Sequence, residues 1–389
     1  MSLELNDIYV DNAATTPVSK VVLKDMLPFF TENYGNPSGL YMLSQESKAA
    51  IEFSRDKVSK VINSKSSEII FTSGGTESNN LALKGFCNNN IENDQNEIII
   101  STVEHHAIIH PAEQMTKIGY ELNYCPVDSQ GIINIEIFEN LINNKTKFIS
   151  IILANNEIGS VQKIKTLVEI TRKKEKEFGT KILFHTDAVQ AIGKIKVDVI
   201  DLGVDLLSIS GHKFNAPKGI GALFLKDDLY LEPLLDGGGQ ERQNRSGTEN
   251  VPSIVGLGKA IELAELNRIE YFSHTNQLRL KMIDLLDKNL PTSIIHSSSD
   301  GLPNILNFSI PNIQGEPILI ALDFKGIMAS SGSACSTASI EPSHVLIAKN
   351  VEENIALGSI RLSFALTNTL EQVEYIAQSL LEIYKDLTN

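Results

Sequence analysis

The chain has 389 residues, of which 42% are hydrophobic, and this length predicts two to three compact units. Its 34 basic and 48 acidic residues give a net charge of −14, which argues against direct binding to nucleic acid or to an anionic membrane. No run approaches the ~20 apolar residues of a membrane span, and the N-terminus lacks a signal-peptide pattern. We therefore expect a cytoplasmic protein that contacts neither nucleic acid nor membrane directly.

Short apolar runs alternate with helix-like segments over most of the chain, which is typical of an α/β layered fold. Polar clusters accompany many of these runs: SGGTES, EHHA, ANNEIG, HTDAVQ and SGHK. Because open α/β sheets bind ligands at the carboxyl ends of their strands, we expect the clusters to surround one site. The predicted strands are Glu68–Thr72, Glu97–Ser101, Phe148–Leu153, Lys181–His185, Leu206–Ile209 and Ala222–Leu225.

The pattern changes near Ile254, where longer helical periods begin. This change predicts a large domain of residues 15–260 and a small domain of residues 261–389, which also takes in residues 1–14. The later part contains two apolar segments and a closing helix, at Asn304–Ile310, Ile318–Leu322 and Leu370–Leu387.

The segment SISGHK places Lys213 after the end of a predicted strand, beside Ser210 and His212. A lysine is most often a solvated surface residue, but in this setting it predicts an amine held near a bound phosphate. Lysine forms Schiff bases with a cofactor aldehyde, and pyridoxal phosphate needs an acidic partner for its ring nitrogen, for which Asp187 is the candidate. The glycine-rich turn before Thr76 would suit an anion, although a plain strand-to-helix turn explains it as well.

The chain has three cysteines, which cannot all pair with one another and which lack zinc-like spacing. Cys87 lies in a helical run and Cys125 precedes a proline, so both are interpreted as packing residues. Cys335 differs, because it lies in SSGSACSTAS, a run of small side chains that is a poor candidate for a helix, a strand or a core.

Taken together and in order, nine motifs over about residues 8–380 resemble those of the cysteine desulfurases of the NifS/IscS type (group I) in the class V pyridoxal-phosphate-dependent aminotransferase family. The resemblance implies pyridoxal-phosphate fold type I, with a mainly parallel seven-stranded sheet between helices and a smaller α+β C-terminal domain that carries a mobile cysteine loop. The motifs are DNAATTP (11–17), SGGTES (73–78), EHHA (104–107), NNEIG (155–159), HTDAVQ (185–190), SGHK (210–213), GGGQERQNRSGT (237–248), SSGSACSTAS (330–339) and SIRLS (359–363).

The resemblance also implies pyridoxal 5′-phosphate as the cofactor and gives roles to the residues around its ring. Lys213 would carry the internal aldimine and later abstract the substrate's Cα proton. Asp187 would keep the pyridine nitrogen protonated, and Gln190 would bind the phenolic oxygen. His105 would stack on the ring and serve as an acid or base, whereas His106 is interpreted as structural.

On the phosphate side, the resemblance implies that Gly75, Thr76, Ser210 and His212 hold the phosphate group. Thr248 would reach this group from the second subunit of a homodimer. Gly75 stands where alanine is frequent in the family, and backbone contacts should tolerate that change.

For the substrate, the resemblance implies L-cysteine. Arg361 would bind its carboxylate in a bidentate pair, helped by Asn156, which would also contact the cofactor. Taken alone, Arg361 fits a surface or domain-interface arginine better, and Asn155 and Asn156 could merely cap a turn.

Cys335 would be the nucleophile that takes the sulfur, leaving L-alanine and a persulfide on the enzyme. The small residues around it predict an arm that moves between the cofactor and sulfur-acceptor proteins such as an iron–sulfur scaffold or other thiolation partners. No resident metal is expected, although Cys335 could transiently ligate an iron–sulfur cluster with a partner.

Other functions stay open at this point. A different class V enzyme, such as a selenocysteine lyase or an aminotransferase, would share the lysine and the aspartate but would not generally need the mobile cysteine. A non-catalytic protein of this fold is a further alternative, against which the set of Lys213, Asp187 and Cys335 weighs heavily.

Overall fold

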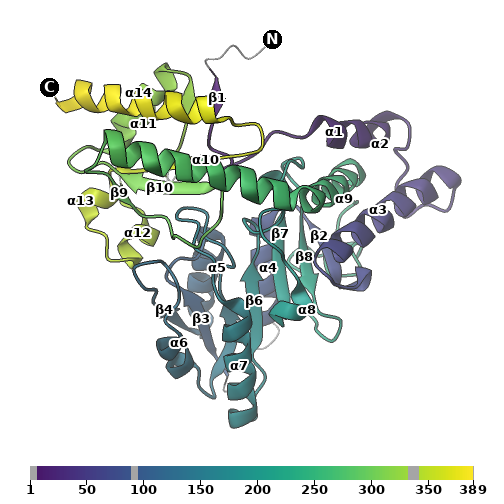
Figure 1. Ribbon diagram of the computed structural model, residues 1–389. Helices are drawn as coiled ribbons and strands as arrows, with labels where there is room; N and C mark the ends of the chain where they lie inside the picture. Colours follow the sequence, from purple (N-terminus) through teal and green to yellow (C-terminus); the bar gives the residue numbers. More distant parts are fainter. Residues whose placement is uncertain (1–6, 89–94, 332–340, 389) are drawn as a thin grey trace.

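A seven-stranded sheet forms the centre of the computed structural model, which describes residues 7–88, 95–331 and 341–388 (Figure 1). Five neighbouring strands are parallel, and β8 runs antiparallel to both of its neighbours. The predicted α/β class with a mainly parallel seven-stranded sheet is therefore confirmed. In sheet order, the strands are β2 (Ile69–Thr72), β8 (Gly221–Leu225), β7 (Leu206–Ser210), β6 (Leu183–Asp187), β5 (Thr146–Ser150), β3 (Glu97–Ser101) and β4 (Glu121–Cys125).

Alternation along the strands explains why the sheet is buried on both faces. In β3, Ile99 points into one hydrophobic core, whereas Ile98 and Ile100 point into the core on the other face. In β6, Leu183 and Phe184 divide in the same way. Each strand therefore needs helices on both sides.

Helices supply those two layers. One core packs the sheet against α4 and α5, and the other packs it against α3, α7 and α9 (Figure 1). The helices of this part of the molecule are α1 (Lys20–Met26), α2 (Pro28–Thr31), α3 (Met42–Val61), α4 (Gly75–Cys87), α5 (His106–Thr116), α6 (Ile135–Leu141), α7 (Ile164–Phe178), α8 (Val199–Leu202) and α9 (Val251–Leu266), with the 3-10 turns η1 (Ser66–Glu68) and η3 (Gly211–Lys213).

The C-terminal part has a hydrophobic core of its own, built on a three-stranded antiparallel sheet and joined by Ile8 and Val10. The apolar segment Ile318–Leu322 lies within a helix of this part. The domain boundaries near residues 14 and 260 stay a prediction. The elements are β9 (Ile294–Ile295), β10 (Ile305–Ser309) and β12 (Ser359–Ser363) in the sheet, β1 (Ile8–Tyr9) paired with β11 (Ile327–Met328), and the helices α10 (Arg268–Asn289), α11 (Gly315–Phe324), α12 (His344–Ala348), α13 (Glu353–Ala356) and α14 (Leu370–Thr388).

The N-terminal segment after β1 links the two cores. Asp11 forms a β-bridge with Ser363 of β12, and the Asn12 side chain donates to the Ser363 carbonyl at 2.8 Å. These contacts fix the path of the next residues, Ala13 and Ala14, which run beneath the polar end of the large sheet.

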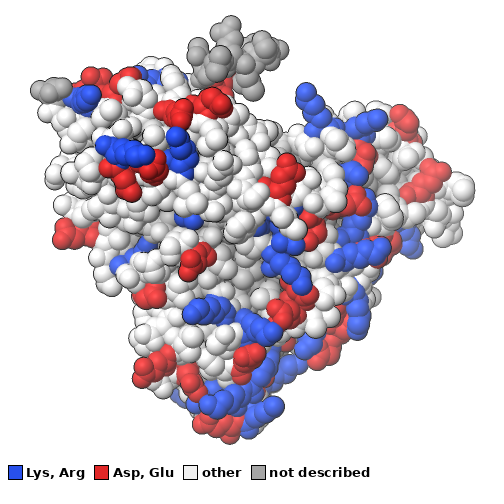
Figure 2. Space-filling model, viewed as in Figure 1, with Lys and Arg blue, Asp and Glu red and all other residues white. Residues whose placement is uncertain are grey.

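Charges of both signs are interspersed over the face shown in Figure 2, including the region of α7 at the bottom of the view. Cations of α7 pair with neighbouring carboxylates, as in the contacts of Lys165 with Asp201 and of Arg172 with Asp205. None of the helices in the described ranges combines the length and apolarity needed to cross a membrane.

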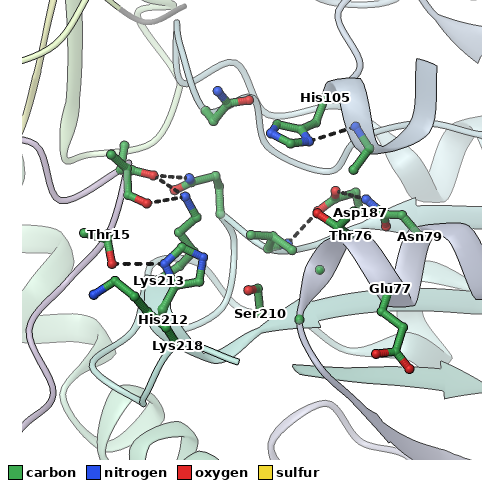
Figure 3. A pocket seen from close by; sticks show the side chains of 18 of the residues that line it. Thr15, Thr76, Glu77, Asn79, His105, Asp187, Ser210, His212, Lys213 and Lys218 are labelled. Atoms are coloured by element: carbon green, nitrogen blue, oxygen red, sulfur yellow. Dashed lines mark hydrogen bonds between the residues drawn. The ribbon is translucent and has the colours of Figure 1, made fainter. Parts of the chain in front are cut away.

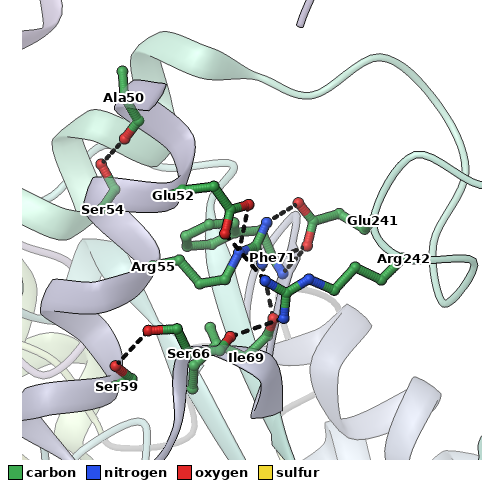
Figure 4. A network of polar contacts seen from close by, with 10 residues as sticks. All are labelled: Ala50, Glu52, Ser54, Arg55, Ser59, Ser66, Ile69, Phe71, Glu241 and Arg242. Atoms are coloured by element: carbon green, nitrogen blue, oxygen red, sulfur yellow. Dashed lines mark hydrogen bonds and ion pairs between the residues drawn. The ribbon is translucent and has the colours of Figure 1, made fainter. Parts of the chain in front are cut away.

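A buried ion pair ties the loop after β8 to the edge of the sheet (Figure 4). Arg55 of α3 makes a bidentate contact with Glu241, with both N–O distances at 2.8 Å. Arg55 also donates to the Ile69 carbonyl and lies over the Phe71 ring, while Glu241 accepts the Phe71 amide. The guanidinium of Arg55 and the carboxylate of Glu241 are thus both hydrogen-bonded, and the guanidinium is also packed on an aromatic ring.

Candidate active site

A cavity of about 570 Å³ lies at the carboxyl ends of the central strands (Figure 3). Segments that are far apart in the sequence contribute to its wall, including the N-terminal segment, the start of α4 and strand β12. The prediction that the polar clusters surround one site is consistent with this arrangement. The cavity is lined by these residues predicted for the site: Gly75, Thr76, His105, Asn156, Asp187, Gln190, Ser210, His212, Lys213 and Arg361.

The start of α4 forms one end of the cavity. Gly74 has φ of +151°, a conformation that favours glycine, and α4 begins at the next residue. A Cβ atom at Gly75 would lie 2.9 Å from Val189 Cγ2 and 3.3 Å from Ser210 Cβ, so a side chain there would crowd the cavity wall. The first amides of a helix lack intrahelical partners, which makes this end suitable for a phosphate.

Lys213 follows β7 in the short turn η3, and its amine points across the cavity (Figure 3). The Nζ atom donates to the carbonyl oxygens of Ala13 and Ala14, both at 2.7 Å. Next to it, His212 shares a hydrogen bond with the Thr15 hydroxyl at 3.1 Å, and burial together with the Lys213 charge lowers its pKa to about 4. His212 is therefore neutral at physiological pH.

Asp187 ends β6, with only 4% of its surface exposed. Its Oδ2 atom accepts from the Asn79 amide at 2.7 Å, and its Oδ1 atom accepts from the Val189 amide at 2.9 Å. Both oxygens of this buried carboxylate thus have a hydrogen-bond donor from the protein. Sequence reasoning did not identify Asn79, although it belongs to the first turns of a helix that begins in a quoted motif.

His105 is the N-cap of α5, and its Nδ1 atom accepts from the Ala107 amide at 3.0 Å. This contact leaves the proton of the neutral ring on Nε2, and burial lowers the pKa of the ring. His106 does not line the cavity and stacks instead on His110, with ring centroids 4.9 Å apart.

Arg361 lies in β12 and is only 2% exposed. Its Nη2 atom donates to Asp11 Oδ1 at 2.6 Å, and its Nη1 atom donates to the Asn156 carbonyl at 3.0 Å. Its Nε atom is buried and has no hydrogen-bond partner among the described residues. Asn155, in contrast, caps the turn by accepting the amides of Glu157 and Ile158, so only Asn156 lines the cavity.

Cys335 lies outside the described residues, as do residues 332–339 of the predicted mobile arm, which spans 330–339. Described residues on the two sides of this segment bond to a residue of the cavity wall, Arg361, and to the neighbour of another, Glu104. Ser330 pairs with the backbone of Arg361, and the His344 ring bonds to the Glu104 carbonyl at 2.9 Å.

The other two thiols are unsuited to nucleophilic chemistry. Cys87 and Cys125 are fully buried, and burial raises the pKa of each to about 12. A thiol with such a pKa is protonated at physiological pH, and the thiolate is the nucleophile. Their interpretation as packing residues agrees with this burial.

Thr248 does not line the cavity of its own chain. It is exposed, on the loop that Glu241 anchors to the sheet. Its predicted role needs a second subunit and stays a prediction.

Comparisons with known proteins identify the family of the chain. The aminotransferase class-V family matches residues 8–376. The cysteine desulfurase IscS of Clostridium botulinum (strain Hall) is 45% identical over 381 residues, covering 97% of this chain and 94% of that protein, and that of Methanosarcina thermophila is 45% identical over 389 residues, covering 100% and 95%. A solved NifS-like protein superposes with a TM-score of 0.91 at 38% identity, covering 97% of this chain and 99% of that one. A structure of SspA in complex with cysteine has a TM-score of 0.82 at 32% identity, covering 93% and 100%. The chain therefore belongs to the class V aminotransferase family and, within it, to the cysteine desulfurases of the NifS/IscS type.

Proposed function

We propose that this cysteine desulfurase binds pyridoxal 5′-phosphate in the cavity and passes the sulfur of L-cysteine to Cys335, leaving L-alanine. The observation that carries the proposal is the convergence of Lys213, Asp187 and Arg361 on one cavity of about 570 Å³. An amine, a buried carboxylate and a guanidinium with unused donor capacity are what the cofactor aldehyde, its ring nitrogen and a substrate carboxylate require.

The residues present fit the cofactor. The start of α4, with Gly75 where a side chain would crowd the wall, suits its phosphate. Ser210 lies beside that end, and His212 lines the same cavity. Asp187, whose two oxygens accept from the Asn79 side chain and the Val189 amide, suits a protonated ring nitrogen. When bound, the cofactor supplies an electron sink for the charge that develops at the substrate's α-carbon.

The protein groups supply the remaining steps. Arg361 would bind the substrate carboxylate. The free amine of Lys213 would take the proton from the substrate's Cα atom. The Cys335 thiolate would attack the substrate sulfur, so that the new S–S bond forms as the C–S bond breaks and the electron pair stays on carbon. His105, neutral with its proton on Nε2, is placed to donate or accept protons at the cavity wall.

Sulfur leaves the enzyme when an acceptor thiol attacks the Cys335 persulfide. By analogy with the relatives named IscS, we propose iron–sulfur assembly proteins as acceptors, together with other thiolation partners. On the two sides of the cysteine segment, Ser330 bridges to Arg361 of the cavity wall, and His344 bonds to the carbonyl of Glu104, next to His105. This placement supports delivery of the thiol to the cavity.

A homodimer is the assembly that this function requires, because Thr248 is exposed and cannot serve its own cavity. Large apolar side chains on and around α2 and α3 are exposed in the single chain and would suit the covered face between two copies. They include Leu27 at 55%, Phe30 at 57%, Leu40 at 95%, Tyr41 at 60% and Met42 at 76%.

The central test is an assay of L-cysteine in the presence of a thiol reductant. We expect a yellow protein that releases sulfide and alanine in equal amounts, and a Cys335→Ser variant that retains the colour but loses at least 100-fold in sulfide release. Sulfide release by Cys335→Ser at the wild-type rate would overturn the assignment of the nucleophile. Keto-acid-dependent amino transfer without sulfide would favour an aminotransferase instead.

A mixing experiment tests the shared site. Lys213→Ala and Thr248→Ala subunits, each weak alone, should regain activity when unfolded and refolded together. The mixed dimer pairs the intact Lys213 of one subunit with the intact Thr248 of the other. No recovery in a mixture shown to contain the mixed dimer would contradict the exchange of Thr248 between subunits.

A further inference from the structure

Lys194 is a fully enclosed lysine for which the proposed chemistry has no role. It is 3% exposed, does not line the ligand cavity, and lines a separate cavity of about 140 Å³ on the other side of Lys213. Burial, with the charge of Lys213, lowers its pKa to about 7. Burying an amine in this way is costly unless its hydrogen bonds are used.

Both hydrogen bonds of the Lys194 side-chain amine go to a single residue. Its Nζ atom donates to the backbone carbonyl of Gln190 at 3.0 Å and to the side-chain oxygen Oε1 at 3.2 Å. These contacts need only two hydrogens, so the amine can make them whether it is charged or neutral. Lys194 thus keeps the Oε1 atom of the Gln190 amide directed toward its own amine.

The other end of that amide lies at the ligand cavity. Gln190 Nε2 donates to the Ala13 carbonyl at 2.9 Å, and the same carbonyl accepts from Lys213 Nζ at 2.7 Å. If the amide turned over, Oε1 would face the Ala13 oxygen and the amide NH₂ would face the Lys194 amine. The contact between the two oxygens would be unfavourable whatever the charge of Lys194, and the contact between the two nitrogens would be unfavourable while the Lys194 amine is charged.

We propose that Lys194 is a positioning residue that fixes the Gln190 amide with its NH₂ group toward the ligand cavity, so that Gln190 can act only as a hydrogen-bond donor to the cofactor. The inference builds on the proposed function, in which Gln190 faces the phenolic oxygen of pyridoxal phosphate. That oxygen is an acceptor, and an amide free to rotate would present a second acceptor to it part of the time.

The test compares Lys194→Met with Lys349→Met. Lys349 is also buried and donates to a backbone carbonyl, that of His296, but does not line the ligand cavity, so its variant controls for the loss of a buried amine. We expect Lys194→Met to bind pyridoxal phosphate about tenfold more weakly and to raise the pH midpoint of the visible absorbance band, whereas Lys349→Met changes neither. The same change made in a Gln190→Ala background should have no further effect on affinity, because the residue through which Lys194 acts is gone.

A second measurement needs no cofactor. In the apoprotein labelled with ¹⁵N-glutamine, hydrogen exchange of the Gln190 side-chain NH₂ should be faster in Lys194→Met than in wild type, with its signal assigned by its loss in Gln190→Ala. If Lys194→Met does not fold, Lys194→Gln replaces it in both measurements.

Unchanged exchange and unchanged affinity would overturn the role of Lys194, as would an equal loss of affinity in the Gln190→Ala background. A wild-type protein that stays colourless with pyridoxal phosphate would instead overturn the proposed function, and the exchange measurement would still decide the contact between Lys194 and Gln190.

Discussion

Arg55 and Arg361 are equally buried, at 2% exposure, yet their hydrogen bonding differs. Arg55 donates through all three nitrogens, to Glu52, to the Ile69 carbonyl and to both oxygens of Glu241. Arg361 makes one contact to a carboxylate and one to a backbone carbonyl, and its Nε has no hydrogen-bond partner among the described residues.

This difference separates a structural charge from one kept for a ligand. A buried arginine whose three nitrogens all donate to protein groups has little left for a small molecule, and its removal leaves a buried carboxylate uncompensated. A buried donor without a partner is costly in the free protein, and a ligand carboxylate can supply what is missing. We therefore expect substitution of Arg55 to change the free energy of unfolding and substitution of Arg361 to change the kinetics with L-cysteine.

The largest effect is expected from Arg55→Met. It leaves Glu241 buried at 4% exposure without its bidentate partner, and we expect a loss of ~3–5 kcal/mol in the free energy of unfolding. Urea denaturation of the wild type and variant measures this loss, and the KM for L-cysteine of the folded fraction should be unchanged. A tenfold rise in KM with an unchanged free energy of unfolding would contradict the structural role of Arg55.

Arg361→Met should have the next largest effect, on substrate rather than on stability. Removing the group that we propose binds the substrate carboxylate should lower kcat/KM for L-cysteine about 100-fold, which corresponds to ~2.7 kcal/mol. Arg361→Lys, which keeps the charge but not the fork of donors, should recover only part of that loss. Steady-state kinetics with cysteine measures both, and a stability loss as large as that of Arg55→Met would show that Arg361 is a structural arginine.

The sequence predicts only part of this difference between a structural and a ligand-binding arginine. Arg361 was identified because SIRLS resembles a family motif, whereas Arg55 lies in a helix with no motif, and its partner Glu241 is 186 residues away. Contacts over such distances depend on how the elements pack, which local pattern does not report.

The same limit applies to the fold and the site. The buried strands were predictable because their apolar runs are continuous, but β4 was missed, since its residues from Glu121 to Tyr124 are largely exposed and polar. Asp187 and Lys213 follow from the chemistry of their residue types beside strand ends. Asn79 and Lys194 act through a neighbour, and only the coordinates bring them to it.

The next prediction concerns a buried histidine, His185, whose protonation makes the free energy of unfolding depend on pH. His185 is fully buried between the hydroxyls of Ser150 and Ser208, and burial lowers its pKa to about 3. The unfolded chain takes up a proton below about pH 6.5 and the folded chain does not, so this stability is complete above pH 6.5 and is lost as the pH falls toward 3.

From pH 7.5 to pH 5.5 this one histidine should remove ~1.4 kcal/mol of unfolding free energy. His185→Asn should lack that part of the pH dependence, while the other histidines contribute equally to both proteins. Urea denaturation at the two pH values gives the difference, and identical pH dependence in both proteins would contradict the neutral state of His185.

The smallest expected effect concerns Asp11, the carboxylate that Arg361 contacts at 2.6 Å in the free site. Asp11→Asn keeps an oxygen that can accept from Arg361 but removes the competing negative charge beside the substrate carboxylate. Because the Asp11 side chain is 19% exposed, solvent screens that charge only in part. We expect the KM for L-cysteine to fall about two- to threefold, ~0.5 kcal/mol. Raising the ionic strength should narrow the gap between the two proteins, since salt screens the repulsion that the substitution removes. A KM that rises instead would mean that Asp11 serves to orient Arg361, and that the unused donor capacity of Arg361 is not by itself what binds the substrate.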